Sequence, residues 1–297
     1  MKDKQLIVFG HSAAQSPLPG VWPSTHRALL PVCGKPLIIH QIEQMTEAAQ
    51  AHIRIARHPG QHAIQTRLGN GEEWGVTLRY SDLHPRDLLA EALANDGRCR
   101  YLNSDELTLC SEHQMSVTPH TISDVGTPQI GDWERANDGL CVGVPSHVWR
   151  TQSPQALHDL NMQVLTRSDK FTIPGVRLHR GNAFCDWQSH LSHSAYVGEN
   201  VFIGKQVCVD QDTRLEANCA LSNGVFIGAG CHLQNVTVLP NTSIEAGTRL
   251  ANAIVTPEGV FPFQQSVCQA SPQVSRCRAN QSWKTGLPNE ALLPAGF

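Results

Sequence analysis

Aliphatic residues recur at every sixth position along much of the C-terminal third of the chain. The series runs through Leu191, Val197, Ile203, Val209, Leu215, Leu221, Ile227, Leu233 and Leu239. A second series precedes it by two residues and contains Ala195, Val201, Val207, Thr213, Cys219, Val225 and Cys231. Neither the 3.6-residue period of a helix nor the two-residue period of a flat strand produces this spacing. The stretch is therefore an internal repeat.

This pattern resembles the hexapeptide repeat of the left-handed parallel β-helix, in which three short strands form one triangular coil. The resemblance implies that the aliphatic residue points into the prism and that the next residue helps the chain to round the corner. That next position is held by Gly198, Gly204, Asp210, Ser222 and Gly228.

The repeat slips once, because the step from Leu233 to Val238 is five residues before Ile244 and Leu250 resume the period of six. A coil of about eighteen residues gives about three and a half coils between Leu191 and Val255. We therefore expect a β-helix over residues 189–256, with residues 257–297 as a tail or cap. The sequence predicts no regular structure in that tail.

Residues 1–188 alternate short apolar runs with helical patterns, which is typical of an α/β domain with a Rossmann-like, mainly parallel sheet. In such sheets ligands bind beyond the carboxyl ends of the strands, so the loops after Phe9 and Leu102 are the expected site. The predicted strands are Gln5–Phe9, Ile53–Ala56, Val76–Tyr80, Arg98–Leu102 and Gly139–Val144, and the predicted helices are Pro36–Ala49, Gln61–Leu68 and Asp87–Ala94.

The composition sets limits on function. A chain of 297 residues suits about two domains. Its net charge of −3 gives no electrostatic argument for binding nucleic acid or an anionic membrane. The apolar run Leu6–Phe9 is too short for a signal peptide, and no segment is long enough to span a bilayer, so we expect a cytoplasmic protein.

The ten cysteines contain no Cys-x-x-Cys pair, which indicates reduced, mostly buried thiols rather than disulfides or a zinc site. The fifteen histidines are equally dispersed. The closest pair, His190 and His193, lacks the spacing of a metal site.

Three segments of the N-terminal domain resemble sugar-1-phosphate nucleotidyltransferases, the nucleotide-sugar pyrophosphorylases. Residues 25–37 are similar to the segment after that family's signature loop, and residues 68–80 to the stretch that leads into its third strand. Tyr101–Asp105 is similar to its strand end with the motif Asn-Gly-Asp. A β-helix follows this domain in mannose-1-phosphate guanylyltransferases and their relatives, so the resemblance covers most of the chain.

The resemblance implies attack of a sugar phosphate on the α-phosphorus of a nucleoside triphosphate, for which the site has to hold two polyanions. The family's loop Gly-Gly-x-Gly-Thr-Arg-Leu aligns with residues 12–18, and its arginine position is occupied by Pro17. Proline lacks a backbone donor, which opposes a phosphate cradle. The candidate nucleotide-binding residues are therefore Ser12, Ala13, Ala14 and Gln15, none of which is the expected glycine.

Other site residues follow from the same alignment. Arg27 occupies the position of the family's catalytic lysine. The family's glycine-containing motif that contacts the base aligns with Leu88–Ala90, so Ala90 is a candidate nucleotide-binding residue. Asp105 is the candidate catalytic and metal aspartate, and Asp186 is the second candidate ligand of Mg²⁺. Asp105 could instead simply end a strand. Lys35 fits a structural position on the rim of the site and Trp74 a packing position.

Three functions remain open at this stage. The first is a divergent nucleotidyltransferase that makes a nucleoside-diphosphate sugar with Mg²⁺. The second is an inactive homologue that binds a nucleotide or nucleotide sugar, or regulates an active partner subunit. The third is a hexapeptide acyltransferase with His232 as general base, although a surface histidine is the simpler reading. We also expect the β-helix to mediate assembly into a homo-oligomer.

Overall fold

The computed structural model divides the chain into two compact units, residues 1–174 (unit 1) and 175–297 (unit 2). Each unit is described by itself. The residues described are 6–10, 26–46, 52–56, 62–96, 98–104, 106–108, 113–120, 131–136, 139–145, 147–178, 181–263 and 274–276.

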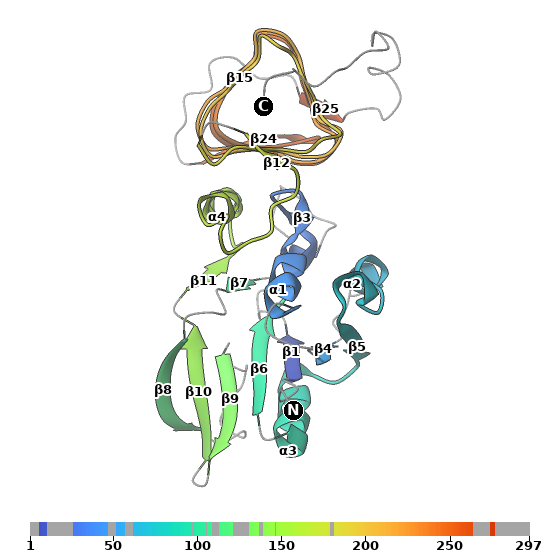
Figure 1. Ribbon diagram of the computed structural model, residues 1–297, viewed down its shortest axis with the longest axis vertical. Helices are drawn as coiled ribbons and strands as arrows, with labels where there is room; N and C mark the ends of the chain where they lie inside the picture. Colours follow the sequence, from blue (N-terminus) through green and yellow to red (C-terminus); the bar gives the residue numbers. More distant parts are fainter. Residues whose placement is uncertain are drawn as a thin grey trace. The chain divides into compact units, whose positions relative to one another are not determined.

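Unit 1 contains a seven-stranded mixed sheet (Figure 1). Its first four strands are parallel, and the last three continue the sheet in antiparallel pairs. The parallel half therefore agrees with the α/β pattern of the sequence, whereas in the antiparallel half only the strand Gly139–Val144, which is β10, was predicted. In spatial order the strands are β5 (Thr77–Ser81), β4 (His52–Ala56), β1 (Leu6–Gly10), β6 (Arg98–Asn103), β9 (Gly131–Ala136), β10 (Gly139–Pro145) and β8 (His113–His120).

The helices of unit 1 are α1 (Leu37–Thr46), α2 (His62–Leu68), α3 (Pro85–Asp96) and α4 (Pro154–Thr166), with short 3₁₀ turns η1 (Arg27–Leu29) and η2 (Glu72–Trp74). Helix α4 was not predicted. Its start signal was present, because Ser153 caps the helix by accepting a hydrogen bond from the Ala156 N–H (3.0 Å) and proline follows at the first position.

Two short strand pairs complete unit 1, and neither was predicted. The hairpin of β2 (Pro31–Val32) and β3 (Lys35–Pro36) lies directly before α1. The pair of β7 (Glu106–Thr108) and β11 (Val148–Arg150) joins segments that are far apart in the chain. Figure 1 shows this second pair beyond the tip of β6.

Unit 2 contains a parallel β-solenoid of about four turns, whose coils superimpose as a triangle in Figure 1. Strands lie above their equivalents one coil later, at first eighteen residues on, as in the register of Phe184 with Phe202 and of Phe202 with Ala220. The strands are β13 (Phe184–Cys185), β14 (His190–Leu191), β15 (Tyr196–Val197), β16 (Val201–Ile203), β17 (Cys208–Val209), β18 (Arg214–Leu215), β19 (Cys219–Leu221), β20 (Phe226–Ile227), β21 (His232–Val238), β22 (Thr242–Ile244) and β23 (Arg249–Thr256).

Both sequence series point into the solenoid, as the repeat predicted. From Val201 onward their members are buried, and all of them except Thr213 and Leu239 belong to one apolar cluster with Val236, Val238, Ile244 and Val255. After the five-residue step Val238 takes the inward position in place of Leu239. Burial of aliphatic side chains along the whole axis stabilises the stack of coils.

The expectation of a single slip was wrong, since the step from Leu250 to Val255 is also five residues. The two short steps lie within β21 and β23, which run through the same corner in successive coils. Val236 stays in register with Ala253 there. Because the two shortened corners lie one above the other in successive coils, the aliphatic side chains of both coils still point inward.

The corners are formed two residues later than the sequence analysis expected. The left-handed backbone conformation occurs at Asn200 (φ 53°), Asp212 (φ 56°) and Asn218 (φ 61°) and at their equivalents in other coils. Gly204, which was expected to round a corner, serves a different purpose. A Cβ atom there would lie 3.0 Å from the carbonyl oxygen of Leu221 in the next coil, so a side chain would press on the backbone.

One corner carries a column of asparagines that the sequence analysis overlooked: Asn182, Asn200, Asn218, Asn235 and Asn252. The Nδ2 atoms of Asn182 and Asn200 donate to the Oδ1 of the asparagine one coil later (3.4 and 3.1 Å), and Asn235 donates to Asn252 (2.6 Å). Asparagine suits this position for two reasons. It tolerates the left-handed backbone conformation, and its side-chain amide both donates and accepts hydrogen bonds.

Antiparallel strands pair at both ends of the solenoid. At the C-terminal end, β24 (Gly259–Pro262) pairs with β23 and β25 (Val274–Arg276) pairs with β22, in the tail where the sequence predicted no regular structure. At the other end, β12 (Val176–Arg177) pairs with β13, so the ladder begins before residue 189.

The asparagine column gives a testable prediction. Asn218→Ala should lower the free energy of unfolding of the solenoid by about 2 kcal/mol, because alanine is strained in the left-handed conformation and cannot accept the hydrogen bond of Asn200. Asn218→Gly should cost less, since glycine removes only the hydrogen bond. Urea unfolding followed by circular dichroism measures both, and a glycine variant as unstable as the alanine variant would contradict this account.

Candidate functional site

The candidate site of unit 1 lies at the carboxyl ends of β1 and β6. Successive parallel strands β1, β4 and β5 extend the sheet in one direction, whereas β6 is added on the other side of β1. Gly10 and Asn103, the last residues of β1 and β6, are in register. The strand order reverses there, and open α/β sheets bind ligands in the crevice at such a reversal.

Several predicted site residues cannot be placed. Ser12, Ala13, Ala14, Gln15 and Asp105 all lie outside the described residues. The nucleotide-binding and catalytic roles given to them therefore stay predictions.

Ala90 lies in the middle of α3, a helix that contacts β1 and β6. Its neighbours Leu88 and Leu89 are buried, and Ala90 itself is half-buried. A methyl side chain offers packing but no hydrogen bond, so any contact of Ala90 with a base would be apolar.

Arg27 begins η1, the first described element after β1. Its side chain is only 8% exposed, and its Nε has no hydrogen-bond partner among the described residues. No described carboxylate forms an ion pair with it. A buried cation without a counter-ion is destabilising, so this position favours an anion.

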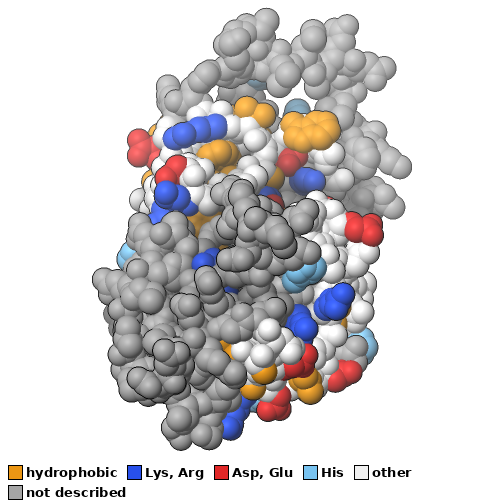
Figure 2. Space-filling model, turned by 60° about the horizontal axis from the view of Figure 1, so that its bottom comes forward, with side chains coloured by type: hydrophobic (Ala, Val, Ile, Leu, Met, Phe, Trp, Pro, Cys, Tyr) orange, Lys and Arg blue, Asp and Glu red, His pale blue; other side chains and the backbone are white. Residues whose placement is uncertain are grey.

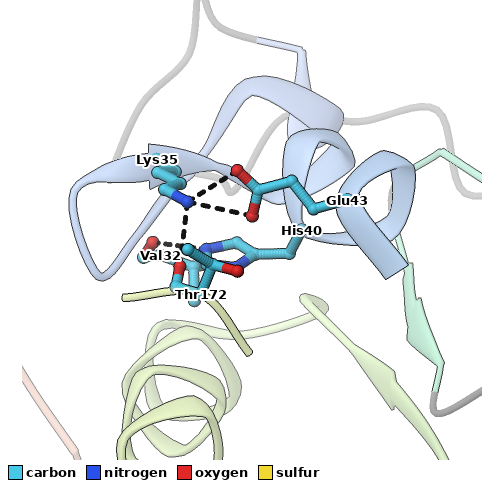
Figure 3. Close-up of polar contacts among 5 residues, drawn as sticks. All are labelled: Val32, Lys35, His40, Glu43 and Thr172. Atoms are coloured by element: carbon cyan, nitrogen blue, oxygen red, sulfur yellow. Dashed lines mark hydrogen bonds and ion pairs between the residues drawn. The ribbon is translucent and has the colours of Figure 1, made fainter. Parts of the chain in front are cut away.

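Lys35 is fully engaged within the protein (Figure 3). Its Nζ donates to Oε1 (2.6 Å) and Oε2 (2.9 Å) of Glu43 and to the carbonyl oxygen of Thr172 (2.8 Å). An ammonium group has three N–H donors, and all three have acceptors here. Lys35 therefore ties β3 to α1 and to the segment after α4, which agrees with a structural position.

His40 lies beside this lysine, also in Figure 3. It is fully buried, and its Nε2 donates to the carbonyl oxygen of Val32 (2.8 Å), while the ring packs edge-on against Phe171. Burial lowers the pKa of His40 from 6.5 to about 4, against an opposing effect of the hydrogen bond to Val32, and Lys35 lowers it further. The ring is therefore neutral at physiological pH.

The motif-like stretch at residues 68–80 has a conformational explanation. Gly69, Gly71 and Gly75 all have positive φ, and they frame η2 before β5. At Gly71 a Cβ atom would lie 2.8 Å from the carbonyl oxygen of Val76. Trp74 packs against the apolar core of unit 1, in agreement with a packing position.

Asp186 belongs to unit 2 and makes turn contacts. It is 2% exposed, its Oδ1 accepts from the Gln188 N–H (3.0 Å), and its carbonyl oxygen accepts from the Ser189 N–H (3.0 Å). These bonds shape a corner of the first coil. Within the described part of the chain, no group of three or more His, Cys, Asp or Glu side chains could hold a metal ion.

A polar cluster at the end of β6 was not predicted. Glu106 is 4% exposed and accepts hydrogen bonds from Asn103 Nδ2 (3.2 Å) and Arg150 Nε (3.0 Å), and its carbonyl oxygen accepts from the Nε2 of Gln41. One sequence signal existed, because an acidic residue next to the apolar end of a strand requires partners when buried. The partner Arg150 could not be identified from the sequence.

The remaining candidate groups fit structural positions. Cys33, Cys99, Cys219 and Cys231 are buried free thiols, and burial raises the pKa of Cys219 to about 12. His232, the residue considered for acyl transfer, is 42% exposed, and its Nε2 lies 3.2 Å from Oε1 of Glu216. Basic and acidic side chains of the described residues are interspersed on the face drawn in Figure 2.

Comparison with models of known protein families and with curated protein sequences found no match for this chain. Within the described residues, no helix has the length and apolar character needed to cross a membrane.

His40 gives a prediction for pH dependence. Its pKa is lower in the folded than in the unfolded chain, so the unfolded state binds more protons between pH 6.5 and about 4, and stability falls as pH is lowered through this window. The loss from this residue should reach about 3 kcal/mol. In His40→Gln the amide can still donate to Val32 O, but the acid sensitivity of unfolding should weaken.

Urea unfolding at pH 7 and at pH 4.5 tests this, with His62→Gln as the control because His62 is exposed at the start of α2. Equal acid sensitivity in both variants would show that His40 does not titrate as described.

Proposed function

We propose that unit 1 binds a nucleotide or nucleotide sugar at the carboxyl ends of β1 and β6, as a divergent relative of the sugar-1-phosphate nucleotidyltransferases. The observation that carries the proposal is the reversal of strand order between these two strands. Arg27, which is buried and has no counter-ion among the described residues, supports an anionic ligand, and the solenoid in unit 2 matches the module expected after such a domain.

Binding without turnover is the form that the sequence favours. The loop after Gly10 has lost the glycines and the arginine of the signature, and Lys35 has all its donors engaged. Such a protein would bind a nucleotide or nucleotide sugar itself or regulate an active partner subunit. Turnover of a nucleoside triphosphate and a sugar 1-phosphate would require Mg²⁺, for which Asp105 is the candidate ligand in unit 1. Asp186 belongs to unit 2, where its carboxylate accepts from the Gln188 N–H.

We also propose that unit 2 mediates homo-oligomer formation. Three exposed apolar side chains lie in or beside its first coil, namely Val176 (62%), Trp187 (78%) and Tyr196 (41%). Large exposed apolar side chains favour contacts between protein surfaces.

Trp187→Ser should therefore lower the molar mass measured by light scattering. An unchanged oligomeric mass in this variant would remove Trp187 from the interface.

Ligand binding can be tested through Arg27. Nucleoside triphosphates and nucleoside-diphosphate sugars should raise the melting temperature of the protein, because a ligand that binds only the folded state stabilises it. Arg27→Met should weaken binding by about tenfold or more, since hydrogen bonds to charged groups contribute about 1.5–3 kcal/mol. Without ligand the variant should be at least as stable as the parent, because it removes a buried unpaired charge.

Arg79→Met is the matched control, as it removes an exposed arginine from β5 of the same unit. Pyrophosphate release measured with Mg²⁺ and sugar 1-phosphates on the same samples separates turnover from binding. If no compound of either class shifts the melting temperature and none is turned over, the proposed function is wrong.

A further inference from the structure

The Glu106 carboxylate has an unusual environment for an acidic residue. Its side chain is 5% exposed, on a three-residue strand whose residues are all buried. One oxygen accepts from Asn103 and the other from Arg150. A buried carboxylate is retained without large cost only when it is hydrogen-bonded and paired with a cation, and Arg150 is its cation.

Arg150 contacts Glu106 through only one of its N–H donors. Arg150 lies opposite Glu106 in the register of β11 with β7, and only its Nε contacts the carboxylate (3.0 Å). Its side chain is 59% exposed, and its two Nη atoms have no partner among the described residues. A guanidinium group has five N–H donors, so four remain available.

This single contact through Nε leaves the two Nη atoms available to bind another group. A pair whose role is only stability would engage the fork of the guanidinium with both carboxylate oxygens. Here the second oxygen accepts from Asn103, and neither Nη atom of Arg150 forms a hydrogen bond with Glu106. A fixed fork of N–H donors matches the oxygens of a phosphate group.

The location of the pair agrees with this chemistry. Asn103, which bonds Glu106, ends β6 and lies in register with Gly10 at the end of β1. Arg150 is therefore connected, through Glu106 and Asn103, to the reversal of strand order. The signature arginine is absent from residues 12–18, so Arg150 offers an exposed guanidinium in addition to the buried one of Arg27.

We propose that Arg150 binds a phosphate group of the ligand at this edge of the sheet, and that Glu106 is a positioning residue that orients its guanidinium. The inference rests on the proposed function, because it assigns a phosphate-binding residue to the same site. Neither residue occurs in any motif that indicated the family.

The experiment is isothermal titration of the full-length protein with inorganic pyrophosphate and, separately, with inorganic phosphate. The parent should bind pyrophosphate, and Arg150→Gln should weaken binding about ten- to a hundredfold through loss of charged hydrogen bonds. Arg150→Lys should recover little of this, because a lysine keeps the charge but loses the fork. Arg79→Met should bind like the parent.

Glu106→Gln tests the positioning role. It should weaken pyrophosphate binding in the parent protein but have little further effect in the Arg150→Gln background, because Glu106 acts only through Arg150. A purely structural role of Glu106 would give the same loss in both backgrounds. The melting temperature of each variant shows that the fold is retained.

Failure of this inference is distinguishable from failure of the proposed function. If the parent binds nucleotides but Arg150→Gln binds nucleotides and pyrophosphate as tightly as the parent, Arg150 is not the phosphate-binding residue and the proposed function stands. If the parent does not bind pyrophosphate or phosphate at all, the inference is overturned, whereas nucleotide binding is judged by its own titrations. Full recovery of affinity by Arg150→Lys would show that Arg150 acts through its charge alone and not through an oriented fork of N–H donors.

Discussion

The solenoid depends on one constraint, which is that each residue lies directly above its equivalent in the next coil. Only then do the inward aliphatic side chains form a continuous core and the backbone groups of successive coils pair. The constraint explains why the two short corners occur in successive coils, within β21 and β23. It also explains the asparagine column, since a residue type that tolerates a corner in one coil can bond to its copy in the next.

Local patterns predicted the solenoid and much of unit 1. A period of six in Leu191–Leu239 appears directly in the sequence, and the strands expected near β1, β4, β5 and β6 all occur. The second short corner was not predicted, because a single inward series of aliphatic residues does not show how whole coils align. Comparison at eighteen and seventeen residues would have revealed both the corner and the asparagines.

The polar contacts of the candidate site could not be predicted in the same way. Lys35 and Thr172 are 137 residues apart in the chain, and Glu106 and Arg150 are 44 apart. Such pairs depend on which strands meet in space, and a single sequence contains no signal for that. The strand β10 was predicted, but its antiparallel pairing with both β8 and β9 was not, for the same reason.

Under the proposed function, the missing glycines at residues 12–15 and the Glu106–Arg150 pair have a common physical interpretation. A cradle of backbone N–H groups needs glycines, because the chain has to approach the phosphate closely. A guanidinium on a long side chain reaches a phosphate without that approach, provided that another group fixes its orientation. Glu106 supplies that orientation from a buried strand, at the end of β6. A protein that had lost the glycines after Gly10 could therefore still hold a phosphate at this edge, but it would hold it by side chains alone. Such a site favours binding more than transfer, since one oriented cation stabilises a bound anion but does not by itself stabilise the charge that develops on a leaving pyrophosphate.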